Sequence, residues 1–474
     1  MNRLRTACLI PLLVGVALVV GWPQAPQAQS LTPRQQLTRD IYQELIEINT
    51  VTATGDTLRA AEAVAARLRA AGFDPADVQV LSPAPRKGNL VARLRGTGAR
   101  RPILLVAHLD VVEARREDWS VDPFKLIEKD GYFYGRGTID DKYMATAFVA
   151  NLIRYKQEGY RPDRDIIVAL ETDEETLDEN AKGIRWLLEN HRALIDAEFA
   201  LNEGAGVGLR NGKPVRNSVQ TAEKMSVQFQ LEVTNKGGHS SLPVRDNAIY
   251  RLAEGLTRLS KFTFPFKINE TTRVFFDRIA EYETQQTAED MRAVLSGTPD
   301  PAAMSLTRLS ANPVYNAQLR TTCVATLLEG GHAINALPQL ARAGVNCRIM
   351  PGEPVEDVLA TLIRVVADDQ IKITQTSVAV VSAPSALHEE IMGAIVKLTA
   401  EFWAGVPIIP TMSAGATDGS YLRNAGIPTY GHSGLASEIG DNRVHGRDER
   451  VQVNSFWQGQ EYLYRLVKIL AGGQ

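Results

Sequence analysis

Short apolar runs alternate with stretches of helical periodicity through the first two hundred residues. Apolar residues recur at helical spacing over residues 36–49, 57–71, 142–155 and 181–191, and short apolar runs cover residues 89–94, 103–107, 166–170 and 198–201. Runs that are apolar on both faces and are separated by helices are typical of a mostly parallel sheet. We therefore expect an α/β fold, with this sheet sandwiched between helices.

The pattern changes near Val219. Residues 226–234 alternate apolar and polar side chains, as expected of a strand with one face in water. A helix is predicted at residues 247–259, followed by a long irregular stretch at 262–320. A strand at 342–349, a helix at 355–366 and a strand at 371–381 are predicted after it. This portion indicates a separate α+β unit.

Beyond Ser382 the first pattern resumes. Helices are predicted at 385–403 and 455–470, and between them lie a Gly-rich loop and a strand at 427–430. We therefore expect a catalytic domain in two parts with an inserted lid or dimerisation-type domain. The predicted boundaries are residues 29–219, 220–382 and 383–474.

The first thirty residues are typical of a secretory signal peptide. Arg3 and Arg5 precede an apolar run over residues 9–20, and a small, polar stretch follows. The run is short for a bilayer span, which takes about 20 apolar residues. We expect cleavage after Ala28, with a retained anchor as the alternative. The prediction is a secreted or periplasmic protein with no membrane contact after cleavage.

Charge and cysteine content further narrow the classes of partner and of site that the chain can have. The 474 residues carry a net charge of −3, and the Lys and Arg residues are scattered, so we expect no nucleic-acid partner. Cys323 and Cys347 fit no zinc or redox spacing. They are either buried thiols or one optional bridge in an oxidising compartment.

Acidic residues and histidine follow several of the predicted strands. His108 and Asp110 follow one strand, Glu174 and Glu175 another, and Glu203 a third. The carboxyl ends of parallel strands form the ligand crevice, so these side chains should meet. Each motif alone is more often structural. Together they predict a divalent metal, because buried carboxylates need compensation and imidazole with carboxylates suits zinc.

Seven segments, in order, carry a family resemblance. They are residues 107–112 (AHLDVV), 118–124 (DWSVDPF), 134–142 (YGRGTIDDK), 171–175 (ETDEE), 202–204 (NEG), 237–241 (GGHSS) and 444–449 (VHGRDE). The chain resembles the dizinc metallopeptidases, a family of aminoacylases, carboxypeptidase S, glutamate carboxypeptidase, carnosinases and succinyl-diaminopimelate desuccinylase. It looks most similar to the branch of carboxypeptidase S and N-acyl-amino-acid hydrolases.

The resemblance implies two zinc ions bridged by Asp140. His108 and Glu203 would complete one site, and Glu175 and His445 the other.

Roles beside the metals follow from the same resemblance. Glu174 would be the general base that takes a proton from the attacking water held by the metals, and Asp110 would hydrogen-bond the ring of His108. His239 in the inserted domain would stabilise the developing oxyanion. The peptide bond before Asp141 would be cis, as is usual in this family.

Substrate recognition is implied for three residues. Arg348 would grip a carboxylate, Asn335 matches a lid asparagine, and the loop that begins at Gly415 resembles the pocket lining. In dimeric relatives the residue matching His239 reaches the partner's site, so a homodimer is one expectation and a monomer with an enlarged lid the other. His191, His332, His388 and His432 are not expected to be ligands.

The predicted function is hydrolysis of the amide bond of a small peptide or N-acyl amino acid with a free carboxylate. Glu203 favours an acylase or carboxypeptidase, since family aminopeptidases tend to have Asp there. A dipeptidase or aminopeptidase is the alternative enzyme, and a non-catalytic binding protein is the alternative from another class.

Overall fold

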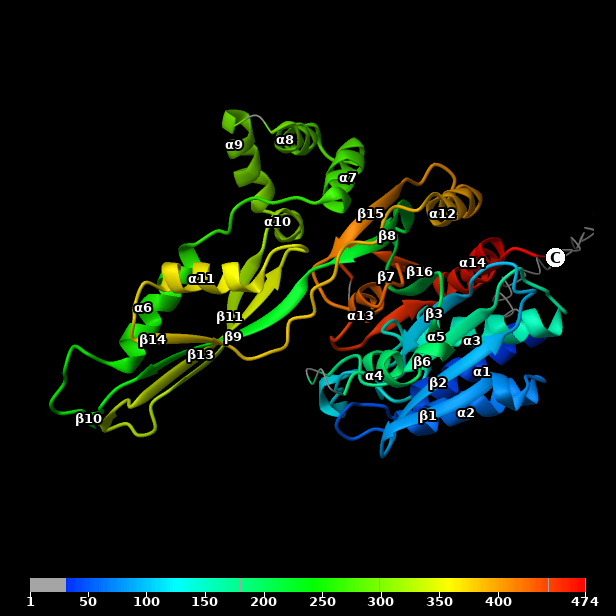
Figure 1. The fold of residues 1–474 in the computed structure, drawn as a ribbon, viewed down its shortest axis with the longest axis horizontal. Helices are drawn as coiled ribbons and strands as arrows, with labels where there is room; N and C mark the ends of the chain where they lie inside the picture. The colour runs from blue at the N-terminus through cyan, green and yellow to red at the C-terminus, as the bar shows by residue number, and fades with distance from the viewer. Residues whose placement is uncertain (1–30, 177, 179–180, 298, 442, 474) are drawn as a thin grey trace, which may run out of the picture.

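The fold consists of two units, each built on its own sheet (Figure 1). A computed structural model describes residues 31–176, 178, 181–297, 299–441 and 443–473. The predicted signal peptide lies outside the described residues. None of the helices within these ranges is both long and apolar enough to cross a membrane.

The larger unit is an eight-stranded mixed sheet in which most of the central pairs are parallel. Its spatial order is β1 (Val78–Ala84), β2 (Lys87–Leu94), β6 (Ile166–Glu171), β3 (Ile103–His108), β7 (Phe199–Arg210), β16 (Thr429–Glu438), β8 (Lys213–Glu223) and β15 (Ile408–Ser413). β3 pairs in parallel with both β6 and β7, and β16 pairs in parallel with β7. The carboxyl ends of these strands therefore share one edge, as predicted.

Helices cover both faces of this sheet. On one face, Ile103 and Leu105 of β3 belong to a core with helices α1 (Pro33–Glu47), α2 (Thr57–Ala70), α3 (Lys142–Gln157), α12 (Glu389–Phe402) and α14 (Val453–Ala471). On the other face, Leu104 and Val106 pack with helices α4 (Gly183–Asn190), α5 (Arg192–Ile195) and α13 (Gly419–Asn424). The doubly apolar sequence of β3 reflects this burial on both sides.

The smaller unit is a four-stranded antiparallel sheet. Its order is β11 (Thr322–Gly330), β13 (Leu340–Ile349), β9 (Met225–Thr234) and β14 (Ile371–Gln375), and it packs against helices α6 (Ala248–Lys261) and α11 (Val355–Val366). β14 is shorter than the predicted strand. At the far tip, β10 (Gly238–His239) pairs with β12 (Ala336–Leu337), well away from the larger sheet (Figure 1).

The expectation of an irregular stretch over residues 262–320 is wrong. This segment forms helices α7 (Glu270–Ile279), α8 (Gln285–Ser296), α9 (Pro299–Ser310) and α10 (Pro313–Leu319), with the turn η3 (Ala280–Tyr282). They share a small core that includes Phe276 and Met291 and reaches Ile409 of β15. Each helix is short, and together they bury apolar side chains that a local pattern leaves scattered.

Smaller elements complete the larger unit. A three-stranded sheet contains β17 (Arg450–Gln452), β5 (Tyr132–Tyr134) and β4 (Ile127–Lys129), and short 3₁₀ turns lie at η1 (Pro75–Asp77) and η2 (Arg116–Asp118). β15 occupies part of the segment expected to be a Gly-rich loop. It pairs in parallel with β8 at the edge of the large sheet.

The two cysteines form a disulfide. Cys323 on β11 lies directly opposite Cys347 on β13, so the bridge joins neighbouring antiparallel strands. Of the two alternatives for these residues, the structure has the bridge.

Candidate metal centre

Histidine and acidic side chains from separate strands meet at the carboxyl edge of the large sheet. His108 is the last residue of β3, Glu174 and Glu175 follow β6, and Glu203 lies within β7. Asp140 stands in the turn just before α3, two residues ahead of its first residue.

Asp140 lies between the two imidazoles. Its Oδ1 is 2.9 Å from Nε2 of His108, and its Oδ2 is 3.0 Å from Nε2 of His445. The same nitrogen of His445 is 2.8 Å from Oε1 of Glu175. One carboxylate thus offers an oxygen to each side of the cluster, as a bridging ligand must.

The donor set fits metal ions. His108, Glu174 and Glu203 have ligand atoms that all lie within 4.8 Å of one another, and so do His108, Asp140 and Glu175. Imidazole nitrogen and carboxylate oxygen are the donors that zinc takes at such sites. The structure therefore brings together the side chains of the predicted ligand set, and the assignment of each ligand stays a prediction.

In the protein without metal, burial and neighbouring charges shift the pKa values of the side chains in this cluster. Burial raises the pKa of Glu203, and the nearby Asp140 adds to the rise. Burial also raises the pKa of Glu174, to about 8. Hydrogen bonds that its ring donates to Asp140 and Glu175 raise the pKa of His445 to about 10. Without a cation, protons must compensate the buried carboxylates, so a divalent ion would relieve the repulsion.

Asp110 contacts His108 differently from the expectation. The ring Nδ1 of His108 donates to the main-chain carbonyl of Asp110 at 2.9 Å, whereas the nearer carboxylate oxygen is 3.7 Å away. The carboxylate instead accepts the main-chain N–H groups of Glu174 at 3.1 Å and Glu175 at 3.0 Å. Asp110 therefore holds two parts of the cluster. Its carbonyl holds the ring of His108, and its carboxylate holds the turn of Glu174 and Glu175.

The peptide bond between Asp140 and Asp141 is cis, as the resemblance implied.

A cavity of about 540 Å³ opens beside the cluster. Glu174, Glu175 and His445 line one part of it, and Arg348, Lys224 and the loop at Gly415 line another. Arg348 comes from β13 of the smaller unit, so both units contribute walls. The predicted carboxylate-binding arginine and loop thus share one cavity with the predicted base.

Lys224 was missed by the sequence reasoning. It is fully buried between β8 and β9, where its Nζ donates to the main-chain carbonyl of Arg320 at 2.6 Å. Burial, together with the nearby charge of Arg348, lowers its pKa to about 7. The only sequence signal is its place at the junction of the two patterns, and many lysines occupy such junctions.

His239 and Asn335 lie elsewhere. The exposed His239 sits on β10 at the far tip of the smaller unit, where its ring contacts Ser241 Oγ at 2.6 Å (Figure 1). The carbonyl of Asn335 accepts the N–H of Ser240 at 3.0 Å. These two predicted residues are together, but they do not reach the metal cluster of their own chain.

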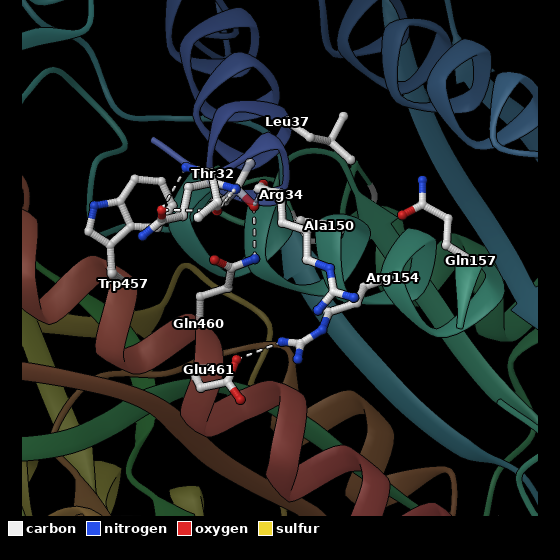
Figure 2. A pocket seen from close by; sticks show the side chains of 11 residues that line it. Thr32, Arg34, Leu37, Ala150, Arg154, Gln157, Trp457, Gln460 and Glu461 are labelled. Carbon is white, nitrogen blue, oxygen red and sulfur yellow. Dashed lines mark hydrogen bonds and ion pairs between the residues drawn. The ribbon is translucent and has the colours of Figure 1, made fainter. Parts of the chain in front are cut away.

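Two other groups of polar side chains lack the combination of histidine and several carboxylates that forms the candidate metal centre. His432 is buried between the carbonyl of Ser218 and the hydroxyl of Tyr462, and burial lowers its pKa to about 4. Figure 2 shows a pocket of about 300 Å³ where Arg154 pairs with Glu461 at 2.6 Å. It lies between α1, α3 and α14, and neither histidine nor a cluster of carboxylates lines it.

Comparison with known proteins decides the family. The model described as Peptidase family M20/M25/M40 matches residues 104–469. The chain belongs to this family. It is 30% identical over 377 residues to "Probable carboxypeptidase S-like 2" of Dictyostelium discoideum, covering 78% of this chain and 71% of the relative. It is 29% identical over 375 residues to human "N-fatty-acyl-amino acid synthase/hydrolase PM20D1", covering 78% and 74%.

Solved structures share the fold. The M20 family metallo-carboxypeptidase Sso-CP2 from Sulfolobus solfataricus matches with a TM-score of 0.70 and 16% identity, over 92% of this chain and 99% of that one. Membership of this family makes the chain a metal-dependent hydrolase that acts on amide bonds, and the metal of the family is typically zinc.

The position of Glu174 between the cluster and the cavity generates a prediction. We expect Glu174→Gln to keep the bound metal and lower turnover of an amide substrate about 10³-fold, since an amide cannot accept a proton. Metal content by mass spectrometry and kcat measure the two effects. Glu189→Gln on the surface of α4 is the matched control. A Glu174→Gln enzyme that turns over within tenfold of wild type would contradict the role of Glu174.

Proposed function

We propose that this enzyme hydrolyses the amide bond of an N-acyl amino acid or small peptide that has a free carboxylate. The observation that carries the proposal is the cavity that places Arg348 and Lys224 in one space with Glu174 and His445. A substrate whose carboxylate meets the two cations has its amide bond directed toward the cluster.

Two zinc ions would occupy the cluster, with Asp140 between them. His108 and Glu203 would hold one ion, and Glu175 and His445 the other, a set that the convergence of donor atoms supports. Bound zinc supplies polarisation of the amide carbonyl and lowers the pKa of water. The remaining chemistry belongs to side chains of this chain.

Glu174 would act as the general base and then as the acid. Its carboxylate lines the cavity beside the cluster, where it can take the proton from water and pass it to the leaving nitrogen. The hydrogen bond from its N–H to Asp110 fixes the start of this side chain. Adjacent Glu175 is then free to serve as a ligand.

Arg348 would bind the substrate carboxylate, and the buried Lys224 beside it would add positive charge to this side of the cavity. In the described part of the chain neither side chain forms an ion pair, and Arg348 donates only to Asn346 Oδ1, at 3.1 Å. Burial lowers the pKa of both groups, so an anion between them would be stabilising. This pair favours a free-carboxylate substrate over the amide of an amino acid.

The names of the relatives support the same class. One is a probable carboxypeptidase and another is a hydrolase of N-fatty-acyl amino acids, and both cover more than two thirds of this chain. A dipeptidase remains the second candidate, since a dipeptide also has a free carboxylate that Arg348 could bind.

A substrate panel tests the proposal. With zinc supplied, we expect hydrolysis of N-acyl amino acids or C-terminally free dipeptides and not of amino-acid amides. Arg348→Met should raise KM about 10- to 100-fold with a smaller change in kcat, because a charge-assisted contact is lost. Arg364→Met, on the neighbouring helix α11, is the control. Hydrolysis of the amides alone would overturn the substrate class.

We also propose that the enzyme works as a homodimer. β11 is an edge strand of the smaller sheet, and its Val324, Leu327 and Leu328 are at least 61% exposed. Long exposed apolar edges favour pairing with another chain. A second copy paired along this edge would cover the patch, and the exposed His239 at the tip would be free to approach the partner's metal centre.

Complementation tests the dimer. We expect His239→Ala and Glu174→Gln each to be nearly inactive alone, whereas co-expressed mixed dimers regain at least a tenth of wild-type activity. Such a dimer holds one site with both functional residues. Mixed samples as inactive as the single variants, or a wild-type protein that sediments as an active monomer, would contradict the proposal.

The proposed location is secreted or periplasmic. The leader-like residues Arg3, Arg5 and 9–20 support this location, and the bridge between Cys323 and Cys347 is compatible with an oxidising compartment.

Fractionation of cells that express the full chain tests this location. We expect the protein in the periplasm or medium, beginning near residue 29, with no free thiol after denaturation without reductant. Recovery from the cytoplasm of the uncleaved chain with three free thiols, those of Cys8, Cys323 and Cys347, would contradict it.

A further inference from the structure

Glu449 is a buried carboxylate that the mechanism does not use. It lies four residues after His445, and its side chain is inaccessible to solvent. Its Oε1 accepts the main-chain N–H groups of Ile139 at 2.7 Å and of Asp140 at 3.2 Å. Its Oε2 accepts the N–H of Gly137 at 3.2 Å and Nη1 of Arg136 at 2.6 Å. Three of these four donors are main-chain groups of the turn that carries Asp140.

Arg136 connects the same turn to the loop of the other ligand. While Nη1 contacts Glu449, Nη2 donates to the main-chain carbonyl of Gly446 at 2.9 Å. Gly446 is the residue after His445. The guanidinium also lies over the ring of Trp119, 5.1 Å from its centroid, which fixes the plane of the fork.

The backbone of His445 is held in an uncommon conformation. Its φ is 60°, in the left-handed region that residues with a side chain adopt only when their surroundings hold them there. The contact from Arg136 to the next carbonyl is a restraint of this kind. The loop is anchored further by β17, where Arg450 pairs with Tyr134 of β5.

We propose that Glu449 and Arg136 are positioning residues that set the spacing between Asp140 and His445. This spacing sets the affinity of the metal site that Glu175 and His445 would form. The inference rests on the proposed metal pair. Glu449 holds the N–H of Asp140 itself, Arg136 holds the carbonyl beside His445, and the two are joined by their ion pair. Asp140 and His445, about three hundred residues apart in sequence, are thereby held at a fixed distance from each other.

A role in stability alone fits these contacts less well. The buried Arg164, at the amino end of β6, also pairs with carboxylates, those of Glu198 and Glu390, yet its pairs contact no predicted ligand. Glu449 instead directs both oxygens at the turn of a ligand. The two buried arginines, Arg136 and Arg164, therefore provide a comparison within the same chain.

Glu449→Gln is the sharpest variant. The two residues have the same shape, but both oxygens of Glu449 face N–H donors, so an amide must place its own NH₂ against two of them. We expect the turn of Asp140 to shift and the zinc affinity of the site of Glu175 and His445 to fall about 10- to 100-fold, the usual cost of losing such a supporting contact. Arg136→Lys should act in the same direction with a smaller effect, since lysine cannot hold Glu449 and the Gly446 carbonyl as a fork.

Zinc affinity is measured by competition with a chelator on the full-length protein, and cobalt substitution reports ligand geometry through its absorption spectrum. Thermal midpoints of the metal-free variants report stability separately. At saturating zinc we expect KM to stay within about twofold of wild type while kcat falls. Arg164→Lys is the control, with a lowered thermal midpoint and wild-type zinc affinity.

The outcomes separate the inference from the proposed function. A wild-type chain that binds no metal overturns the proposed function itself. A wild type that binds two zinc ions, with Arg136→Lys and any folded Glu449→Gln binding them equally well and giving the wild-type cobalt spectrum, overturns the positioning role. Arg136→Lys keeps the test decisive if Glu449→Gln fails to fold.

Discussion

The concentration of buried negative charge at one edge of a parallel sheet is the constraint on which the rest of the structure depends. Carboxylates of Asp140, Glu174, Glu175 and Glu203 gather there with the imidazoles of His108 and His445. These carboxylates are half-buried and close together, and an uncompensated buried charge costs several kcal/mol. Protons or a cation must balance such a cluster, and the scaffold must keep the side chains from moving apart.

The scaffold provides that rigidity in layers. β3, β6 and β7 are adjacent strands whose apolar residues are buried on both faces, so the residues at their ends have fixed positions. The turns beyond the strands are then held by buried carboxylates that accept main-chain N–H groups. Asp110 holds the turn of Glu174 and Glu175, and Glu449 holds the turn of Asp140. The same device appears twice around one centre.

The smaller unit contributes part of the wall of the cavity beside this centre. Arg348 reaches the cavity from β13, and Lys224 lies where the chain passes from one sheet to the other. Helices of the insertion contact the edge strand of the large sheet, where Arg278 donates to the carbonyl of Ile408 at 2.8 Å and Gln318 to that of Met412 at 2.7 Å. The insertion is thus joined to the large sheet by hydrogen bonds as well as by the chain.

Much of this architecture could be predicted from local pattern. The runs before His108 and Glu174 are apolar at every position, and only a covered sheet explains them, so the edge where they end was predictable. Helices α7 to α10 were not, because each is short and its burial depends on residues such as Ile409 that are distant in sequence. The contacts of Asp110 and the place of Lys224 beside the cavity were also hidden, since they depend on which atoms of the folded chain face each other.

Anomalous X-ray diffraction at the zinc absorption edge, on crystals of the protein grown with zinc, tests the central claim most directly. Two anomalous peaks about 3.5–4 Å apart are predicted, one on each side of Asp140. One peak should contact His108 and Glu203, and the other Glu175 and His445. Crystals with no peak at this edge of the sheet, or with zinc bound only elsewhere, would contradict the account.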